Sequence, residues 1–110
     1  MKLEYVDKTT MIAEIDGELD HHNAVRIREK LDHEIMAKHI NRMVFDFSKL
    51  TFMDSSGIGV IIGRYKKLKG VDGKVCIVTK SSNVSKLLKL SGLVKLMPVY
   101  GSVNQALKKI

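Results

Sequence analysis

Two short apolar runs constrain the fold of this chain more than any other feature. Residues 43–47 read Met-Val-Phe-Asp-Phe, and residues 74–79 read Lys-Val-Cys-Ile-Val-Thr. Such runs are typical of strands that are covered on both faces, as in parallel sheets. Each run is followed by apolar residues at helical spacing, so strands and helices alternate along the chain. This alternation predicts a mostly parallel sheet with right-handed crossovers.

Four helices are expected from the apolar spacing and from the residues that favour helix ends. The first would follow an Asp20 N-cap and run to about Lys38. The second would follow residues 54–56 and stop at Gly70.

The last two helices are short. Ser82 or Asn83 is expected to cap the third helix, and Gly92 would lie just past its end. Ser102 and Gln105 have the spacing of a capping box, which predicts a closing helix that runs to the last residue.

The remaining strands lie near the two ends of the sequence. Apolar and polar residues alternate on both sides of residues 7–8, which predicts an opening antiparallel hairpin. Residues 94–99 are expected to form the last strand, and Pro98 marks it as an edge strand. We therefore expect a single α/β domain over residues 1–110, without a linker. Its element order would be β-β-α-β-α-β-α-β-α around a five-stranded sheet.

The net charge is basic, because 19 Lys and Arg stand against 12 Asp and Glu, which gives +7. The basic residues are spread along the chain, there is no Trp, and aromatic residues are not interleaved with them. Single-strand binding needs aromatic stacking platforms, and groove binding needs a clustered basic stripe. Direct nucleic-acid binding is therefore not expected. A solvated basic surface, or an acidic protein partner, explains the charge instead.

The sequence does not resemble that of a membrane or secreted protein. No apolar run approaches the roughly 20 residues that cross a bilayer. The first ten residues carry charges where a secretory signal has its apolar stretch. The single cysteine, Cys76, cannot form an internal disulfide bond and is typical of a reducing compartment. We expect a cytoplasmic protein in which Cys76 is an inert core residue.

The segment Asp-Ser-Ser-Gly-Ile-Gly at residues 54–59 is the most informative for function. It joins a strand to a helix, and Asp and Ser are preferred N-cap residues, so capping alone explains their presence. A phosphate at this point would also meet unpaired backbone N–H groups and the positive end of the helix dipole. The residues alone leave both interpretations open, and they do not separate Ser55 from Ser56 as the modified residue.

Three segments together resemble the anti-sigma factor antagonist family, which is built on the STAS domain. They are FDFSKLTFMDSSGIGVIIGRYK, the earlier GELDHHNA and the later LLKLSGL. The resemblance extends from the first hairpin to the last helix, and it is strongest to the sporulation members of the family. It implies a regulator that is not an enzyme and needs no cofactor.

The resemblance also implies a mechanism and a set of site residues. The unphosphorylated protein would bind an anti-sigma factor that is also an ATP-dependent serine kinase, and so release a sporulation sigma factor. The kinase would phosphorylate Ser55, and a metal-dependent serine phosphatase would reverse this step. The residues expected to contact the partner are Asp20, His21, His22, Asp54, Ser56, Gly57, Ile58 and Gly59. A stress-response pathway with the same partner switching is the alternative.

Other chemistries fit the sequence less well. Asp20-His21-His22 resembles part of a metal-binding motif, but the further Asp and His motifs of a two-metal cage are missing. Gly57, Gly59 and Gly63 resemble a phosphate-binding loop, but no lysine follows them directly. The chain also lacks the G-x-S-x-G pattern of a serine hydrolase. Neither a metal site nor nucleotide binding is therefore favoured.

Two glycines inside the second helix need an explanation, because each costs about 1 kcal/mol relative to alanine. Gly59 and Gly63 are four residues apart and lie on one helix face. Close packing of the helix on the sheet would explain them. Close approach of a partner's backbone would explain them as well.

Overall fold

The central sheet has five strands in the order β1-β2-β4-β6-β7. The computed structural model describes residues 1–110. β1 and β2 form an antiparallel hairpin, and every other neighbouring pair is parallel. The predicted fold class is therefore confirmed. The strand bounds are Lys2–Tyr5 for β1, Thr10–Glu14 for β2, Arg42–Asp46 for β4, Lys74–Val78 for β6 and Val99–Tyr100 for β7.

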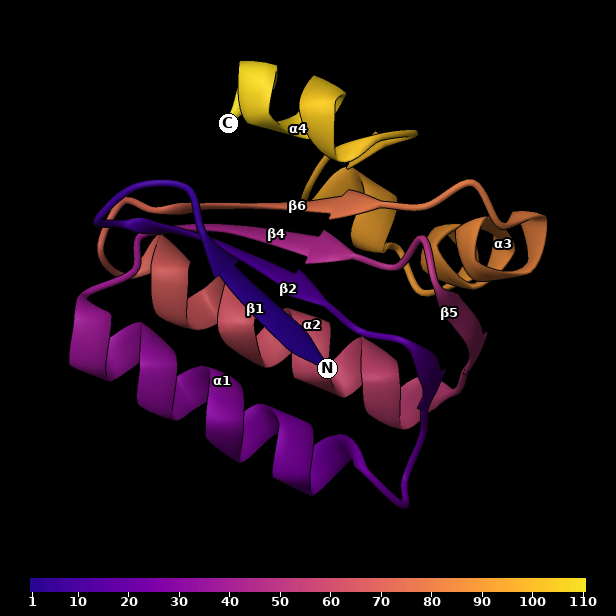
Figure 1. The fold of residues 1–110 in the computed structure, drawn as a ribbon. Coiled ribbons are helices and arrows are strands. Elements are labelled where there is room, and N and C mark those ends of the chain that lie inside the picture. Colours follow the sequence, from indigo (N-terminus) through magenta and orange to yellow (C-terminus); the bar gives the residue numbers. More distant parts are fainter.

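Four helices surround this sheet, as predicted. Two long helices, α1 (Ala24–Lys38) and α2 (Ser55–Lys69), lie side by side on one face of the sheet (Figure 1). The short α4 (Val103–Lys109) lies over the opposite face, and α3 (Ser82–Leu90) lies beyond the carboxyl ends of the strands. None of these helices has the length and apolar character required to span a bilayer.

Alternating side chains of the central strands supply two separate cores. Met43 and Phe45 of β4 belong to the larger cluster, together with Leu31 of α1. Val44 points the other way and belongs to a smaller cluster with Ala106 of α4. Because successive side chains of a strand face opposite sides, a sheet with helices on both faces requires apolar residues at consecutive positions. This is the physical reason for the continuous apolar runs of the sequence.

Cys76 of β6 lies in the smaller cluster and is 1% exposed. Burial raises the pKa of its thiol to about 12. The reactive thiolate is therefore negligible at neutral pH, as expected for a core cysteine.

The first helix begins later than predicted, and Asp20 is not its N-cap. Asn23 occupies the N-cap position, although its side chain makes no capping hydrogen bond. The Asp20 carboxylate instead accepts a hydrogen bond from the His22 N–H at 3.0 Å, and its carbonyl accepts one from the Ala24 N–H at 2.9 Å. Asp20 thus stabilises a separate turn before the helix, which short polar side chains also favour.

Two serines cap the short helices. Ser81, rather than Ser82 or Asn83, caps α3 and accepts a hydrogen bond from the Val84 N–H at 3.2 Å. The predicted Ser102 cap of α4 is confirmed. The prediction for α3 missed by one residue because the sequence offers several adjacent capping residues.

The predicted strand at residues 94–99 is largely wrong. Gly92 adopts a left-handed conformation with φ of 82°, and a short 3-10 helix, η1 (Leu93–Lys95), follows it. Only β7 pairs with the sheet, and it begins directly after Pro98. Proline has no N–H to donate, so the ladder cannot continue through it. The prediction that this strand lies at the edge is confirmed.

A second, two-stranded sheet was not predicted. β3 (Gly17–Leu19) and β5 (Leu50–Met53) pair in parallel, with a register shift after Gly17. Gly17 has a φ of 69°, which favours glycine at this position. These strands are too short to give a clear alternating pattern, so only the tertiary structure reveals them. They carry the two loops that form the candidate site.

Candidate functional site

The loops that follow β3 and β5 lie side by side. Because the two strands are parallel, their carboxyl ends meet at the same edge. The Asp54 N–H donates a hydrogen bond to the Leu19 carbonyl at 3.3 Å, and the His21 N–H donates one to Asp54 Oδ2 at 3.4 Å. The structure therefore brings Asp20, His21 and His22 next to the Asp54-Ser55 segment. Residues more than 30 positions apart in the sequence share one surface.

Asp54 connects the two loops and caps α2. Its Oδ1 accepts a hydrogen bond from the Ser56 N–H at 2.8 Å, and its Oδ2 lies 3.6 Å from His21 Nδ1. Partial burial by itself would raise the pKa of the Asp54 carboxyl. The hydrogen bonds from Ser56 and His21 outweigh this effect and hold the pKa below its ordinary value. Asp54 is therefore ionised at neutral pH.

The lowered pKa of Asp54 predicts a specific dependence of stability on pH. A carboxyl whose pKa is lower in the folded state stabilises it above the ordinary pKa of 3.8, and this contribution disappears as the pH falls through the folded value. Asp54→Asn keeps a good N-cap residue but removes the charge. We expect the difference in unfolding free energy between the wild type and Asp54→Asn to be constant near neutral pH and to shrink below about pH 4. Urea denaturation at a series of pH values measures this difference, and a difference that grows on acidification would contradict the assignment.

Ser55 is the first residue of α2, and its side chain is exposed, whereas Ser56 is half-buried. No acidic residue lies in the first turn of the helix. A group attached to Ser55 would reach solvent beside the positive end of the helix dipole without disturbing the core. Exposure thus favours Ser55 over Ser56 as a modification site, a distinction that the residues alone, without the family resemblance, did not provide.

Three glycines of α2 have different surroundings. A Cβ at Gly57 would lie 2.5 Å from Met53 Cγ and 3.0 Å from Leu19 Cγ, so close packing explains this glycine. A Cβ at Gly59 or Gly63 would meet nothing within 4 Å. Close packing on the sheet is therefore the wrong explanation for Gly59 and Gly63. Gly59 is exposed on the same helix as Ser55.

The other expected contact residues differ in exposure. His21 and His22 are exposed, and their rings lie 4.0 Å apart. Asp20 is 7% exposed and Ile58 8% exposed. Any contribution of Asp20 and Ile58 to a partner surface would therefore act mainly by positioning neighbouring groups. No group of three or more His, Cys, Asp or Glu side chains is gathered in a metal-binding arrangement.

An apolar surface that was not predicted from the sequence lies between β5 and α3. Phe52 of β5 is 50% exposed and lines a hollow of about 230 Å³. Val84 and Leu87 of α3 line the same hollow. An exposed phenylalanine was not anticipated because the strand that carries it was not recognised.

Comparison with protein families matches residues 3–106 to the STAS domain. The chain belongs to the STAS domain family. This STAS domain is 38% identical over 100 residues to an anti-sigma F factor antagonist from Paenibacillus polymyxa. The aligned region covers 91% of this chain and 86% of the relative. It is 35% identical to an anti-sigma F factor antagonist from Lysinibacillus sphaericus, over 84% of this chain and 79% of the relative. An anti-sigma-B factor antagonist from Listeria monocytogenes is 26% identical, over 82% of this chain and 81% of the relative.

Solved structures agree with these relatives. The STAS domain superposes on unphosphorylated SpoIIAA, an anti-sigma factor antagonist, with a TM-score of 0.87 and 33% identity. This match covers 98% of the chain and 93% of SpoIIAA. SpoIIAA from Bacillus in its phosphorylated form matches with a TM-score of 0.78 and 32% identity, over 98% and 96% of the two chains. SpoIIAA is thus a relative that exists in both phosphorylation states.

Proposed function

We propose that this STAS domain is an anti-sigma factor antagonist that phosphorylation of Ser55 switches off. In its unphosphorylated form it binds an anti-sigma factor that is also an ATP-dependent serine kinase, and this binding releases a sporulation sigma factor. A metal-dependent serine phosphatase restores the active form. The domain itself catalyses no reaction, requires no cofactor and works in the cytoplasm.

The observation that carries this proposal is the position of Ser55. The serine is exposed at the start of α2, directly after a charged Asp54 and next to the His21-His22 loop. A kinase can reach it without unfolding the domain, and the helix dipole favours the added phosphate. The two phosphorylation states of the related SpoIIAA support the same mechanism.

The surface around Ser55 is the proposed binding face for the anti-sigma factor. It combines exposed His21 and His22, the open Gly59 and the half-exposed Phe52. Apolar contacts supply affinity when they are buried against a partner, and the polar groups fix the orientation. A phosphate on Ser55 would add negative charge to this face. Binding of the anti-sigma factor would then require this charge to be desolvated, or would be opposed by repulsion from acidic groups of the partner.

The sigma pathway is proposed to be sporulation rather than a stress response. The identity to the anti-sigma F factor antagonists is higher than that to the anti-sigma-B factor antagonist. Pairwise binding measurements with purified anti-sigma factors of both kinds test this choice. Binding only to the stress-response partner would overturn it and leave the switch itself intact.

The direct test of the switch is to incubate the purified protein with its anti-sigma factor and ATP, and then to map phosphate by mass spectrometry. A single phosphate on Ser55, which is absent from Ser55→Ala, is expected. A matched Ser56→Ala variant should still be phosphorylated. Phosphate on Ser56 alone, or no phosphate with a kinase that is active on another substrate, would contradict the proposal.

Gly59 gives a further prediction for the binding face. Because open space surrounds it, Gly59→Ala should stabilise the fold by roughly 0.5–1 kcal/mol through its higher helix propensity. Gly59→Leu should fold equally well but bind the anti-sigma factor about tenfold more weakly, since its side chain would keep the partner away. Thermal unfolding and calorimetric binding separate the two effects. Loss of the fold in Gly59→Leu would instead favour a packing role.

A further inference from the structure

The edge of the sheet at β6 is only half covered. β7 pairs with β6 only at Ile77 and Val78. On this side of the sheet, residues 74–76 have no neighbouring strand. An uncovered edge offers backbone hydrogen-bonding groups to another extended chain.

The ladder stops for an identifiable chemical reason. The Ile77 N–H donates a hydrogen bond to the Pro98 carbonyl at 3.0 Å, so the backbone groups of Ile77 point toward β7. Those of Val75 point the same way, because hydrogen-bonding directions repeat every second residue of a strand. Pro98 has no N–H to donate to the Val75 carbonyl. Val75 thus presents both a donor and an acceptor at the open edge.

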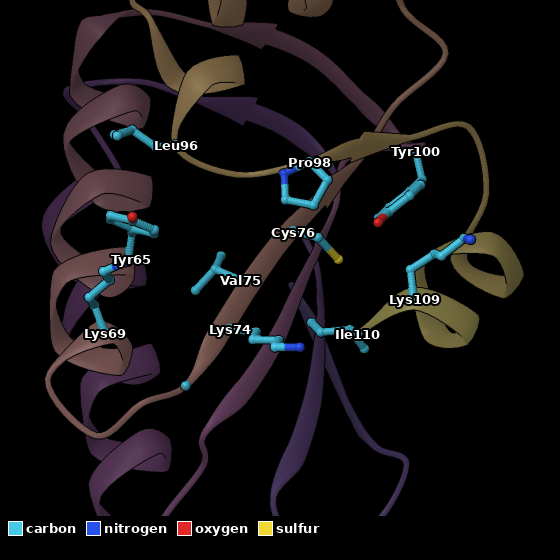
Figure 2. A pocket seen from close by; sticks show the side chains of 11 residues that line it. Tyr65, Lys69, Lys74, Val75, Cys76, Leu96, Pro98, Tyr100, Lys109 and Ile110 are labelled. Atoms are coloured by element: carbon cyan, nitrogen blue, oxygen red, sulfur yellow. The ribbon is translucent and has the colours of Figure 1, made fainter.

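A groove of about 190 Å³ runs along this edge, and its two walls have similar chemistry (Figure 2). Tyr65 of α2 and Leu96 line one wall, and Tyr100 and Ile110 line the other. Side chains of an added strand would point alternately toward the two walls. Each wall therefore offers an apolar contact to every second residue of such a strand.

Three lysines surround the groove. Lys69 lies on the wall formed by α2, Lys74 lies at the start of β6, and Lys109 lies on α4 (Figure 2). None of the three forms an ion pair with a carboxylate of this chain. The surface is therefore complementary to negative charge.

We propose that this edge binds an acidic, extended segment of a partner protein, which adds as a short strand beside β6. The backbone groups of Val75 require an extended chain, and the lysines require acidic side chains. A second copy of this domain would not suit the site, because symmetric pairing at β6 would bring two sets of the same lysines together. Binding of an acidic segment at this edge would also account for part of the excess positive charge of the chain.

The proposal is independent of the function assigned to Ser55. The groove lies at the amino end of β6, whereas Ser55 lies at the opposite end of the sheet, where α2 begins. Both surfaces could therefore be occupied at once. Only three residues of β6 are uncovered, which is about 10 Å of strand, so binding is expected to be weak and strongly dependent on salt.

The probe for a test is a fluorescent peptide with the sequence Glu-Glu-Val-Val-Val-Glu-Glu and blocked ends. Titration of the full chain, followed by fluorescence anisotropy and amide chemical shifts, should give binding that weakens with added salt and shifts centred on Val75. Lys74→Glu and Lys109→Glu should each weaken binding about tenfold. Lys30→Glu, an equal change of charge on the exposed side of α1, should leave it within about twofold.

Backbone pairing is tested separately from charge. The peptide is synthesised with a methyl group on one backbone nitrogen of its valine segment or on the adjacent one. One of these methylations should weaken binding at least about tenfold and the other should be tolerated, because only alternate N–H groups of the peptide would face β6. Equal effects of the two methylations would overturn strand addition at this edge. Equal binding of the peptide by Lys74→Glu, Lys109→Glu and the control Lys30→Glu would overturn it as well. So would an absence of binding at millimolar peptide, self-association of the domain through β6, or equally tight binding of a short oligonucleotide at the same residues.

Discussion

Ser55→Asp is expected to bind the anti-sigma factor about a hundredfold more weakly than the wild type, whereas Ser55→Ala should bind as well as the wild type. A unit charge about 5 Å from an acidic partner group is repelled by roughly 3 kcal/mol at an effective dielectric constant near 20. Each 1.4 kcal/mol corresponds to a factor of ten in affinity. Phosphoserine carries nearly twice this charge, so the phosphorylated protein should bind more than about a thousandfold more weakly.

Calorimetric titration of the three proteins with the anti-sigma factor, in the absence of ATP, measures this effect. The Asp54 N-cap should hold α2 in place in each variant, because its hydrogen bond to the Ser56 N–H does not involve the Ser55 side chain. Thermal unfolding therefore serves as the control and should be nearly unchanged. Equal affinity of Ser55→Asp and Ser55→Ala for the partner would refute the electrostatic switch.

Gly73→Ala is expected to lower the free energy of unfolding by about 3 kcal/mol. Gly73 lies in the turn between α2 and β6, and its N–H donates a hydrogen bond to the Leu68 carbonyl at 2.7 Å. A Cβ at this position would collide with the Asn41 carbonyl oxygen and lie 2.8 Å from the Leu68 carbonyl oxygen. Both obstacles are backbone atoms, so the end of α2 or the start of β4 would have to move.

Gly59→Ala is the matched control, since it adds the same methyl group to open space on the same helix-and-strand unit. The two variants should therefore change stability in opposite directions in urea denaturation with similar slopes. A loss below about 1 kcal/mol for Gly73→Ala would mean that the turn relaxes easily and that its close packing contributes little to stability.

The α/β architecture of this protein follows from local sequence patterns. Apolar residues at consecutive positions of β4 and β6 require cover on both faces, and helical spacing supplies that cover from α1, α2 and α4. The segment from Asp54 to Ser56 also pointed to a helix start that could accept a phosphate. These signals are local, because strand and helix periodicity and capping act within a few residues.

The assembly of the functional surfaces, in contrast, depends on long-range packing. The pairing of β3 with β5 brings His21 to Asp54, and neither short strand has a periodic pattern that would reveal it. Exposure separates Ser55 from Ser56, and the surroundings separate Gly57 from Gly59. The half-covered edge of β6 likewise depends on where Pro98 meets the sheet. Each of these features depends on how distant segments are placed relative to one another, and local sequence preferences do not encode these positions.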